Sequence, residues 1–177
     1  MPGVIVAAET PPDLTSFYTA FAPLCFTLLG LWLIVVQTRH AEWRHSAPHR
    51  TRAYALSINF ALPGMMALLA LVDPGNASLW RAAFAIVALA AGAVLAGVAL
   101  RGPGRHNRTA ALINGLVTIV YVAIAVVAIA PKVVKNLGIH LSALEVEELL
   151  LSALVLVAVN VAWILMFEEV EEPPASA

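Results

Sequence analysis

The sequence predicts an all-α integral membrane protein with five transmembrane helices per chain, its N-terminus outside and its C-terminus inside. Of its 177 residues, 61% are hydrophobic and only 12% are charged, a balance that a soluble fold could not bury. The apolar residues also gather into five continuous runs near the length of about 20 residues that a membrane-spanning helix needs. A β-barrel would show short alternating segments instead, so the runs indicate helices.

The five runs divide the chain into one membrane domain and two short ends. The expected spans are Phe17–Gln37, Ala53–Val72, Leu79–Leu100, Thr109–Ala130 and Ala143–Phe167. Residues 1–16 contain no basic residue, which argues against a cleaved signal peptide and favours an extracytoplasmic segment before an anchoring first span. Residues 17–167 then form the transmembrane domain, and residues 168–177 an acidic cytoplasmic tail.

The positions of the basic residues predict the orientation. Seven of the ten lie in the two loops assigned to the inside, namely Arg39, Arg44, Arg50, Arg52, Arg101, Arg105 and Arg108. The opposite side has Arg81, Lys132 and Lys135. Eight arginines against two lysines, with abundant alanine, suggest a GC-rich bacterial genome. We therefore expect a multi-pass protein of the bacterial inner (plasma) membrane, with the lipid bilayer as its first partner.

Polar and small residues of the first span fall on one helical face. With about 100° per residue, this stripe contains Thr19, Pro23, Thr27, Gly30, Ile34 and Gln37. Cys25 and Trp32 project from the other side. A polar stripe at membrane depth lines water if several copies surround an axis. Alternatively, it only packs helices together, with each threonine hydroxyl bonded to the carbonyl one turn back.

The middle spans carry further polar and small positions. The second has Asn59 and a Pro63-Gly64 pair that suggests a kink; the third has the ladder Ala88, Gly92 and Ala96; the fourth has Asn114, Thr118 and Tyr121 on one face. Ladders of small residues allow close helix packing in membranes. We expect the third span to pack closely and the polar face of the fourth to be a second candidate pore lining.

Glutamates begin the last span. Glu145, Glu148 and Ser152 share a face with Trp163, Asn160 lies to one side, and Glu147 points roughly the opposite way. In an oligomer, Glu145 and Glu148 would form an outer charge ring that concentrates cations. A plainer role is also open for Glu145, because Ser142 and Glu145 have the spacing of a capping box.

The sequence contains no pattern typical of catalysis, cofactor binding or nucleic-acid binding. His40, His45 and His49 share one loop, but their spacing matches no zinc signature, and Pro48 is expected to interrupt any helix that aligned them. Cys25 is the single cysteine, so no intrachain disulfide is possible. We expect neither a metal nor a cofactor, and no enzymatic activity.

Two functions remain open. The favoured hypothesis is an oligomeric bacterial channel that conducts a small ion, with a cation preferred, along the polar helix faces. The alternative is a non-conducting membrane scaffold or partner subunit, in which the same faces only pack against other helices.

The predicted orientation can be tested with topology reporters. A reporter fused after Phe167 should be active as a cytoplasmic fusion, and one fused before Phe17 as an extracytoplasmic fusion, because the arginine-rich loops stay inside. Two termini on the same side would mean that the number of spans is not five.

Overall fold

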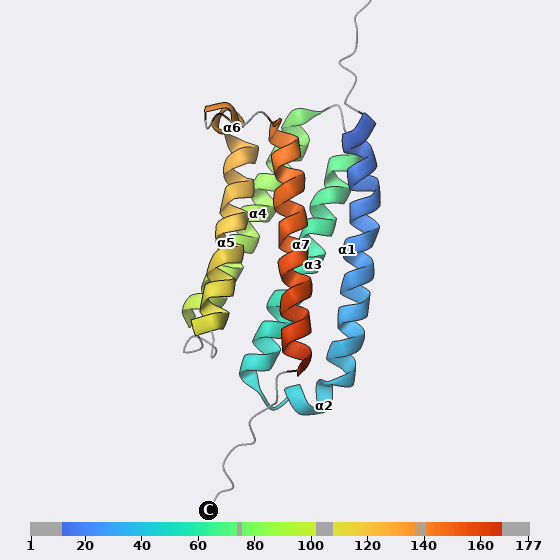
Figure 1. Ribbon diagram of the computed structural model, residues 1–177, viewed down its shortest axis with the longest axis vertical. Coiled ribbons are helices and arrows are strands. Elements are labelled where there is room, and N and C mark those ends of the chain that lie inside the picture. The colour runs from blue at the N-terminus through green and yellow to red at the C-terminus, as the bar shows by residue number, and fades with distance from the viewer. Residues whose placement is uncertain (1–11, 74–75, 102–107, 137, 139–140, 168–177) are drawn as a thin grey trace, which may run out of the picture.

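The computed structural model describes residues 12–73, 76–101, 108–136, 138 and 141–167, and within them every regular element is a helix. Five of these helices have the length and composition needed to cross a membrane. The prediction of an all-α protein with five candidate spans is therefore confirmed (Figure 1). The predicted tail, 168–177, and most of the predicted N-terminal segment lie outside the described residues.

The helices begin and end close to the expected positions. The long ones are α1 (Pro12–Thr38), α3 (Ala47–Val72), α4 (Ala77–Arg101), α5 (Arg108–Ile129) and α7 (Ala143–Phe167). Two short helices that we did not predict, α2 (His40–Trp43) and α6 (Lys132–Asn136), follow α1 and α5. Hydropathy detects neither, because each is short and lies outside the apolar runs.

The largest difference from the sequence prediction is the start of α3. This helix begins six residues before the expected Ala53 and includes Pro48, Arg50 and Arg52. Pro48 lies in the first turn, where a missing backbone N–H removes no helical hydrogen bond, and His45 lies before the helix, so no helix aligns His45 with His49. The proline therefore helps to begin α3, and the two arginines extend the helix beyond its apolar run.

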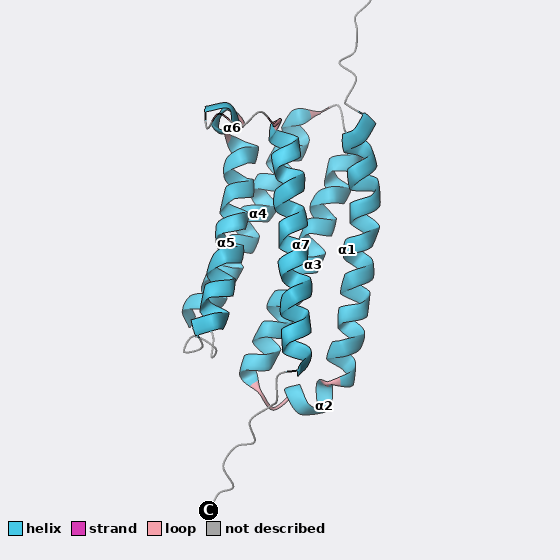
Figure 2. Ribbon diagram, in the orientation of Figure 1, coloured by secondary structure: helices cyan, strands magenta, loops and turns pink. Residues whose placement is uncertain are grey.

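The five long helices run alternately up and down the bundle (Figure 1). α1 packs most extensively on α3, and α4 on α5, while α7 contacts α1, α3 and α5 (Figure 2). At one end, which we call the acidic end, α1, α4 and α7 begin and Asp73, Glu145, Glu147 and Glu148 lie. At the other, the basic end, α3 begins and Arg39, Arg44, Arg50 and Arg52 lie.

α1 and α3 approach each other closely at Gly64. A Cβ added to this glycine would lie 3.0 Å from Cβ of Cys25 and 3.2 Å from Cε2 of Phe26. Cys25 is fully buried in the main apolar cluster, together with Met66 and Ala67 of α3. The inward side of α1 is thus the side that carries Cys25 and Trp32, opposite the polar stripe, and the absence of a side chain at Gly64 allows the contact.

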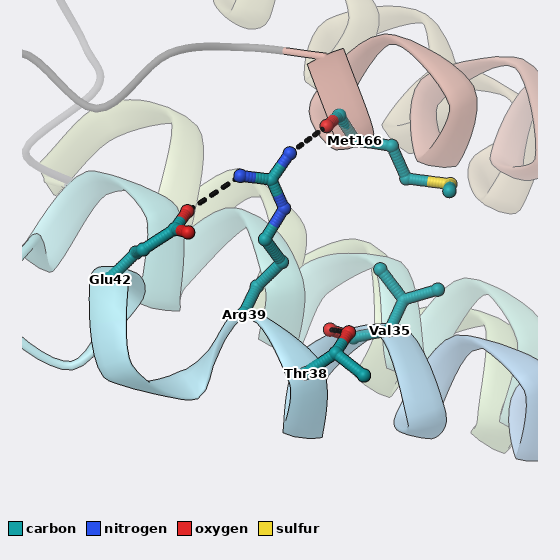
Figure 3. A network of polar contacts seen from close by, with 5 residues as sticks. All are labelled: Val35, Thr38, Arg39, Glu42 and Met166. Atoms are coloured by element: carbon teal, nitrogen blue, oxygen red, sulfur yellow. Dashed lines mark hydrogen bonds and ion pairs between the residues drawn. The ribbon is translucent and has the colours of Figure 1, made fainter.

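Arg39 joins three helices at the basic end. Its guanidinium donates hydrogen bonds to the carboxylate of Glu42 in α2, at 2.6 Å, and to the carbonyl of Met166 in the last turn of α7 (Figure 3). Carbonyls in the last turn of a helix have no intrahelical partner and carry partial negative charge, so a cation stabilises them. The end of α1 is thereby tied to the end of α7.

Substituting Gly64 should test this close packing. Gly64→Ala is expected to destabilise the protein by about 1–3 kcal/mol because the new methyl group overpacks the contact with Cys25. Gly30→Ala is the matched control, since no atom lies within 4 Å of its added Cβ, and it should be neutral or slightly stabilising. Thermal unfolding in detergent micelles measures both variants, and equal midpoints would contradict the packing role of Gly64.

Candidate functional site

Four polar side chains from three helices gather inside the acidic end. Tyr18 comes from the second turn of α1, Arg81 from the first turns of α4, and Glu147 and Glu148 from the start of α7. The ring of Tyr18 packs edge-on against Phe84 of α4, which also packs on Trp80, and all three belong to the apolar cluster that contains Leu151 of α7. We call these four residues the acidic-end site. They lie far apart in the sequence, and the packing of three helices brings them together.

Glu147 is the most unusual member of this site, because its side chain is 0% exposed. Neither carboxyl oxygen has a hydrogen-bond partner. Its direction follows from the inward face of α7, which consists of Glu147, Leu151, Leu154, Ala158 and Leu165, spaced at three and four residues or their sums. A carboxyl group therefore occupies a position where the helix otherwise places apolar side chains.

Arg81 lies at the same end of the bundle, but among the described residues it forms no ion pair with Glu147. Its guanidinium lies over the ring of Trp80, 5.4 Å from the ring centroid, and its buried Nε has no hydrogen-bond partner. A cation held against an aromatic face keeps most of its charge available to its surroundings. Arg81 is thus held by Trp80 and leaves the oxygens of Glu147 unoccupied.

The site also contains unpartnered oxygens from its other members. The hydroxyl of Tyr18 is buried without a hydrogen-bond partner, and so is Oε1 of Glu148, whose side chain is partly exposed. Carboxylate and hydroxyl oxygens can bind a proton, accept a hydrogen bond from water or coordinate a hard cation. Glu148 reaches the protein surface, whereas Glu147 does not.

Glu145 has a different environment from the other two glutamates. Its backbone N–H donates to the Ser142 hydroxyl at 3.2 Å, and its carboxylate accepts from the Ser142 backbone N–H at 2.6 Å. The capping box predicted from the sequence is therefore confirmed. Glu145 is exposed and begins α7, whereas Glu148 lies one turn further along the same face and is partly buried.

The polar stripe of α1 lies on the outer surface of the bundle. Its members Thr19, Pro23, Thr27, Gly30 and Gln37 are all exposed. The hydroxyls of Thr19 and Thr27 donate to the carbonyls of Thr15 and Pro23, at 2.7 and 2.8 Å. Each hydroxyl is thus satisfied within its own helix, as in the packing alternative, and the stripe faces away from the other helices of the chain.

The remaining candidates divide between outward and inward positions. On α7, Asn160 is exposed and bonded to the Leu156 carbonyl, and Ser152 is partly buried. On α5, Tyr121 is fully buried, while Asn114 and Thr118 are partly buried and joined by a bond from the Thr118 hydroxyl to the Asn114 carbonyl. The polar face of α5 therefore points into the bundle, whereas that of α7 points out.

The small-residue ladder of α4 lies against α5. Ala88 and Gly92 are buried, Ala96 is partly buried, and a Cβ added to Gly92 would meet Cβ of Tyr121 at 3.8 Å. This surface is therefore used within one chain. Of the polar faces predicted from the sequence, only those of α1 and α7 lie on the outside, where a second copy of the chain could contact them.

The histidine loop forms an aromatic cluster at the basic end. The ring of His49 stacks on Trp43 with centroids 5.9 Å apart, and its Nδ1 is 2.7 Å from the Ser46 hydroxyl. Trp32 also contacts Trp43 and donates to the Ala53 carbonyl at 3.3 Å. Among the described residues, no group of three or more histidine, cysteine or acidic side chains could hold a metal ion.

Sequence reasoning did not select Glu147. The polar residues of α7 were used to predict its functional face, and Glu147 points away from that face. A signal was present in the large apolar residues: Leu151, Leu154 and Leu165 continue the spacing from Glu147 and mark the inward face. Assigning the inward face from them would have placed Glu147 inside the bundle.

Comparisons with protein-family models, with curated proteins and with solved structures found no match for this chain. The site must therefore be interpreted from its own geometry.

Replacing Glu147 should show that its burial is costly for the fold. Glu147→Leu is expected to stabilise the protein by about 1–3 kcal/mol, because it removes a buried polar group that has no hydrogen-bond partner. Glu145→Leu, the control, should lower the unfolding midpoint because it removes half of the capping box. Thermal unfolding in detergent micelles compares them. A less stable Glu147→Leu protein would mean that this carboxyl makes stabilising contacts.

Proposed function

We propose that this chain is a multi-pass protein of the bacterial inner membrane that conducts a small cation as an oligomer. The observation that carries the proposal is the carboxyl group of Glu147, fully buried and unpartnered inside the acidic end. Ionisable side chains inside membrane helices are rare, and they commonly mark the paths of ions and protons.

An ionised carboxylate without a partner is costly away from water, and Leu at this position would continue the apolar inward face of α7. The carboxyl therefore has a use other than packing. Its negative charge and oxygen atoms suit a hydrated cation or a proton, and Tyr18 and Glu148 add oxygens beside it.

An oligomer is proposed because the acidic half of one bundle is densely packed. Phe60, Met66, Tyr121 and Leu151 are among the largest fully buried side chains, and they lie between the acidic and the basic end. The polar faces of α1 and α7 lie outside instead. In the proposed arrangement these faces meet around an axis, and Glu148, partly exposed, links the path to Glu147.

A non-conducting scaffold is the second candidate, and a specific observation favours it. The hydroxyls of Thr19 and Thr27 are already bonded to carbonyls of their own helix, so the stripe needs no water. Gly30 leaves open space beside it, which suits a close contact with another helix.

Flux measurements on purified protein in lipid vesicles separate the two functions. Glu147→Gln removes the buried charge with little change of shape, and we expect it to reduce proton, sodium or potassium flux by about tenfold. Glu145→Gln is the matched control, because glutamine preserves the capping box while removing a carboxylate two residues away, and its flux should stay close to that of the unchanged protein.

Three results would contradict this proposal. The absence of ion flux through the unsubstituted protein at every tested voltage, pH value and cation gradient would favour the scaffold. Anion-selective flux would exclude a cation site. A larger loss from Glu145→Gln than from Glu147→Gln would point to the exposed charge ring predicted from the sequence, and equal losses would mean that the buried carboxyl has no special role.

A further inference from the structure

A cavity lies between α3, α5 and α7 in the half of the bundle near the basic end. Its volume is ≈ 670 Å³, within the range of about 300–1,000 Å³ that is typical of ligand pockets. Most of its wall is aliphatic or aromatic, with Leu56, Val117, Val157 and Val161 among the lining side chains. It is open on one side, and the exposed rings of Trp163 and Phe167 also line it.

The cavity contains three polar side chains, Arg52 and Asn59 from α3 and Asn114 from α5. Asn59 is 7% exposed, and its buried Oδ1 has no hydrogen-bond partner. A buried amide that lines an open apolar cavity without a protein partner indicates that a ligand or water completes its hydrogen bonds. Arg52 lies two helical turns nearer to the basic end, a rise of about 10 Å along α3.

We propose that this cavity binds a membrane phospholipid with an anionic headgroup. The phosphate would lie at Arg52, an acyl chain would follow the apolar wall, and a water held beside the ester carbonyls would donate to Oδ1 of Asn59. Arg52 begins the same helix as Arg50, and Arg39 and Arg44 lie at the same end, so the surrounding charge is complementary to an anionic lipid. The inference is independent of cation conduction.

Phosphatidylglycerol and phosphatidylcholine are the probes that test the headgroup. The purified full chain is mixed with either lipid in mild detergent, and native mass spectrometry counts the retained lipid. We expect phosphatidylglycerol to be retained at one site per chain and phosphatidylcholine to be retained less. Equal retention of the two lipids would overturn recognition of the anionic headgroup.

Two arginine variants test the position of the site. Arg52→Gln should weaken retention of phosphatidylglycerol by about fivefold, which corresponds to the contribution of one basic residue near an anionic membrane surface. Arg50→Gln, the control, removes an exposed charge on the same helix that does not line the cavity, and retention should be unchanged. Equal weakening would mean that the lipid is attracted to the basic end as a whole, which would overturn the proposal.

Two valine variants test the cavity itself. Val161→Phe fills space between the helices and should abolish retention, whereas Val159→Phe, on the exposed face of α7 outside the cavity, should not change it. Circular dichroism with thermal unfolding shows that both variants are folded. Unchanged retention in folded Val161→Phe would overturn the proposal, and a change of oligomeric state instead would assign the cavity to a second copy of the chain.

Discussion

Close contact at small residues is the constraint on which the arrangement of the five helices depends. In the bilayer proposed for this chain, the hydrophobic effect between helices is weak, because lipid tails are as apolar as leucine, so packing must hold the bundle together. α1 approaches α3 at Gly64, where a methyl group would lie 3.0 Å from Cβ of Cys25. α4 approaches α5 where Gly92 lies opposite Tyr121. These two pairs are the most extensive in the protein, and α7 packs across them.

The two pairs also determine which side of each helix remains outside. Because Cys25 and Gly64 must meet, the opposite face of α1, with Thr19, Thr27 and Gly30, lies on the surface. The polar face of α7 is outside for a similar reason, since its leucines fill the space between the pairs. A polar helix face in this chain need not be the face that points into the bundle, so a polar stripe does not by itself identify the interior.

The two ends of the bundle differ in chemistry. Inside the acidic end, Glu147 is buried near Arg81, and the arginine is held by Trp80 instead of by an ion pair. At the basic end, Arg39 is bonded to Glu42 and to the end of α7, and Arg52 lines the cavity that contains Asn59. The acidic end therefore suits a cation and the basic end an anionic group, and packed side chains such as Tyr121 and Met66 separate them.

The sequence by itself determined the helical class, the five long apolar helices and the cap formed by Ser142 and Glu145, because each depends on residues close together in the chain. It did not determine that α3 begins at Ala47, ahead of its apolar run, because hydropathy does not detect the polar first turns of a helix. Only the tertiary structure decided that Glu147 is buried while Glu145 is exposed. Their environments depend on Tyr18, Arg81 and the leucines of the inward face, which are brought together by packing between helices and not by sequence spacing.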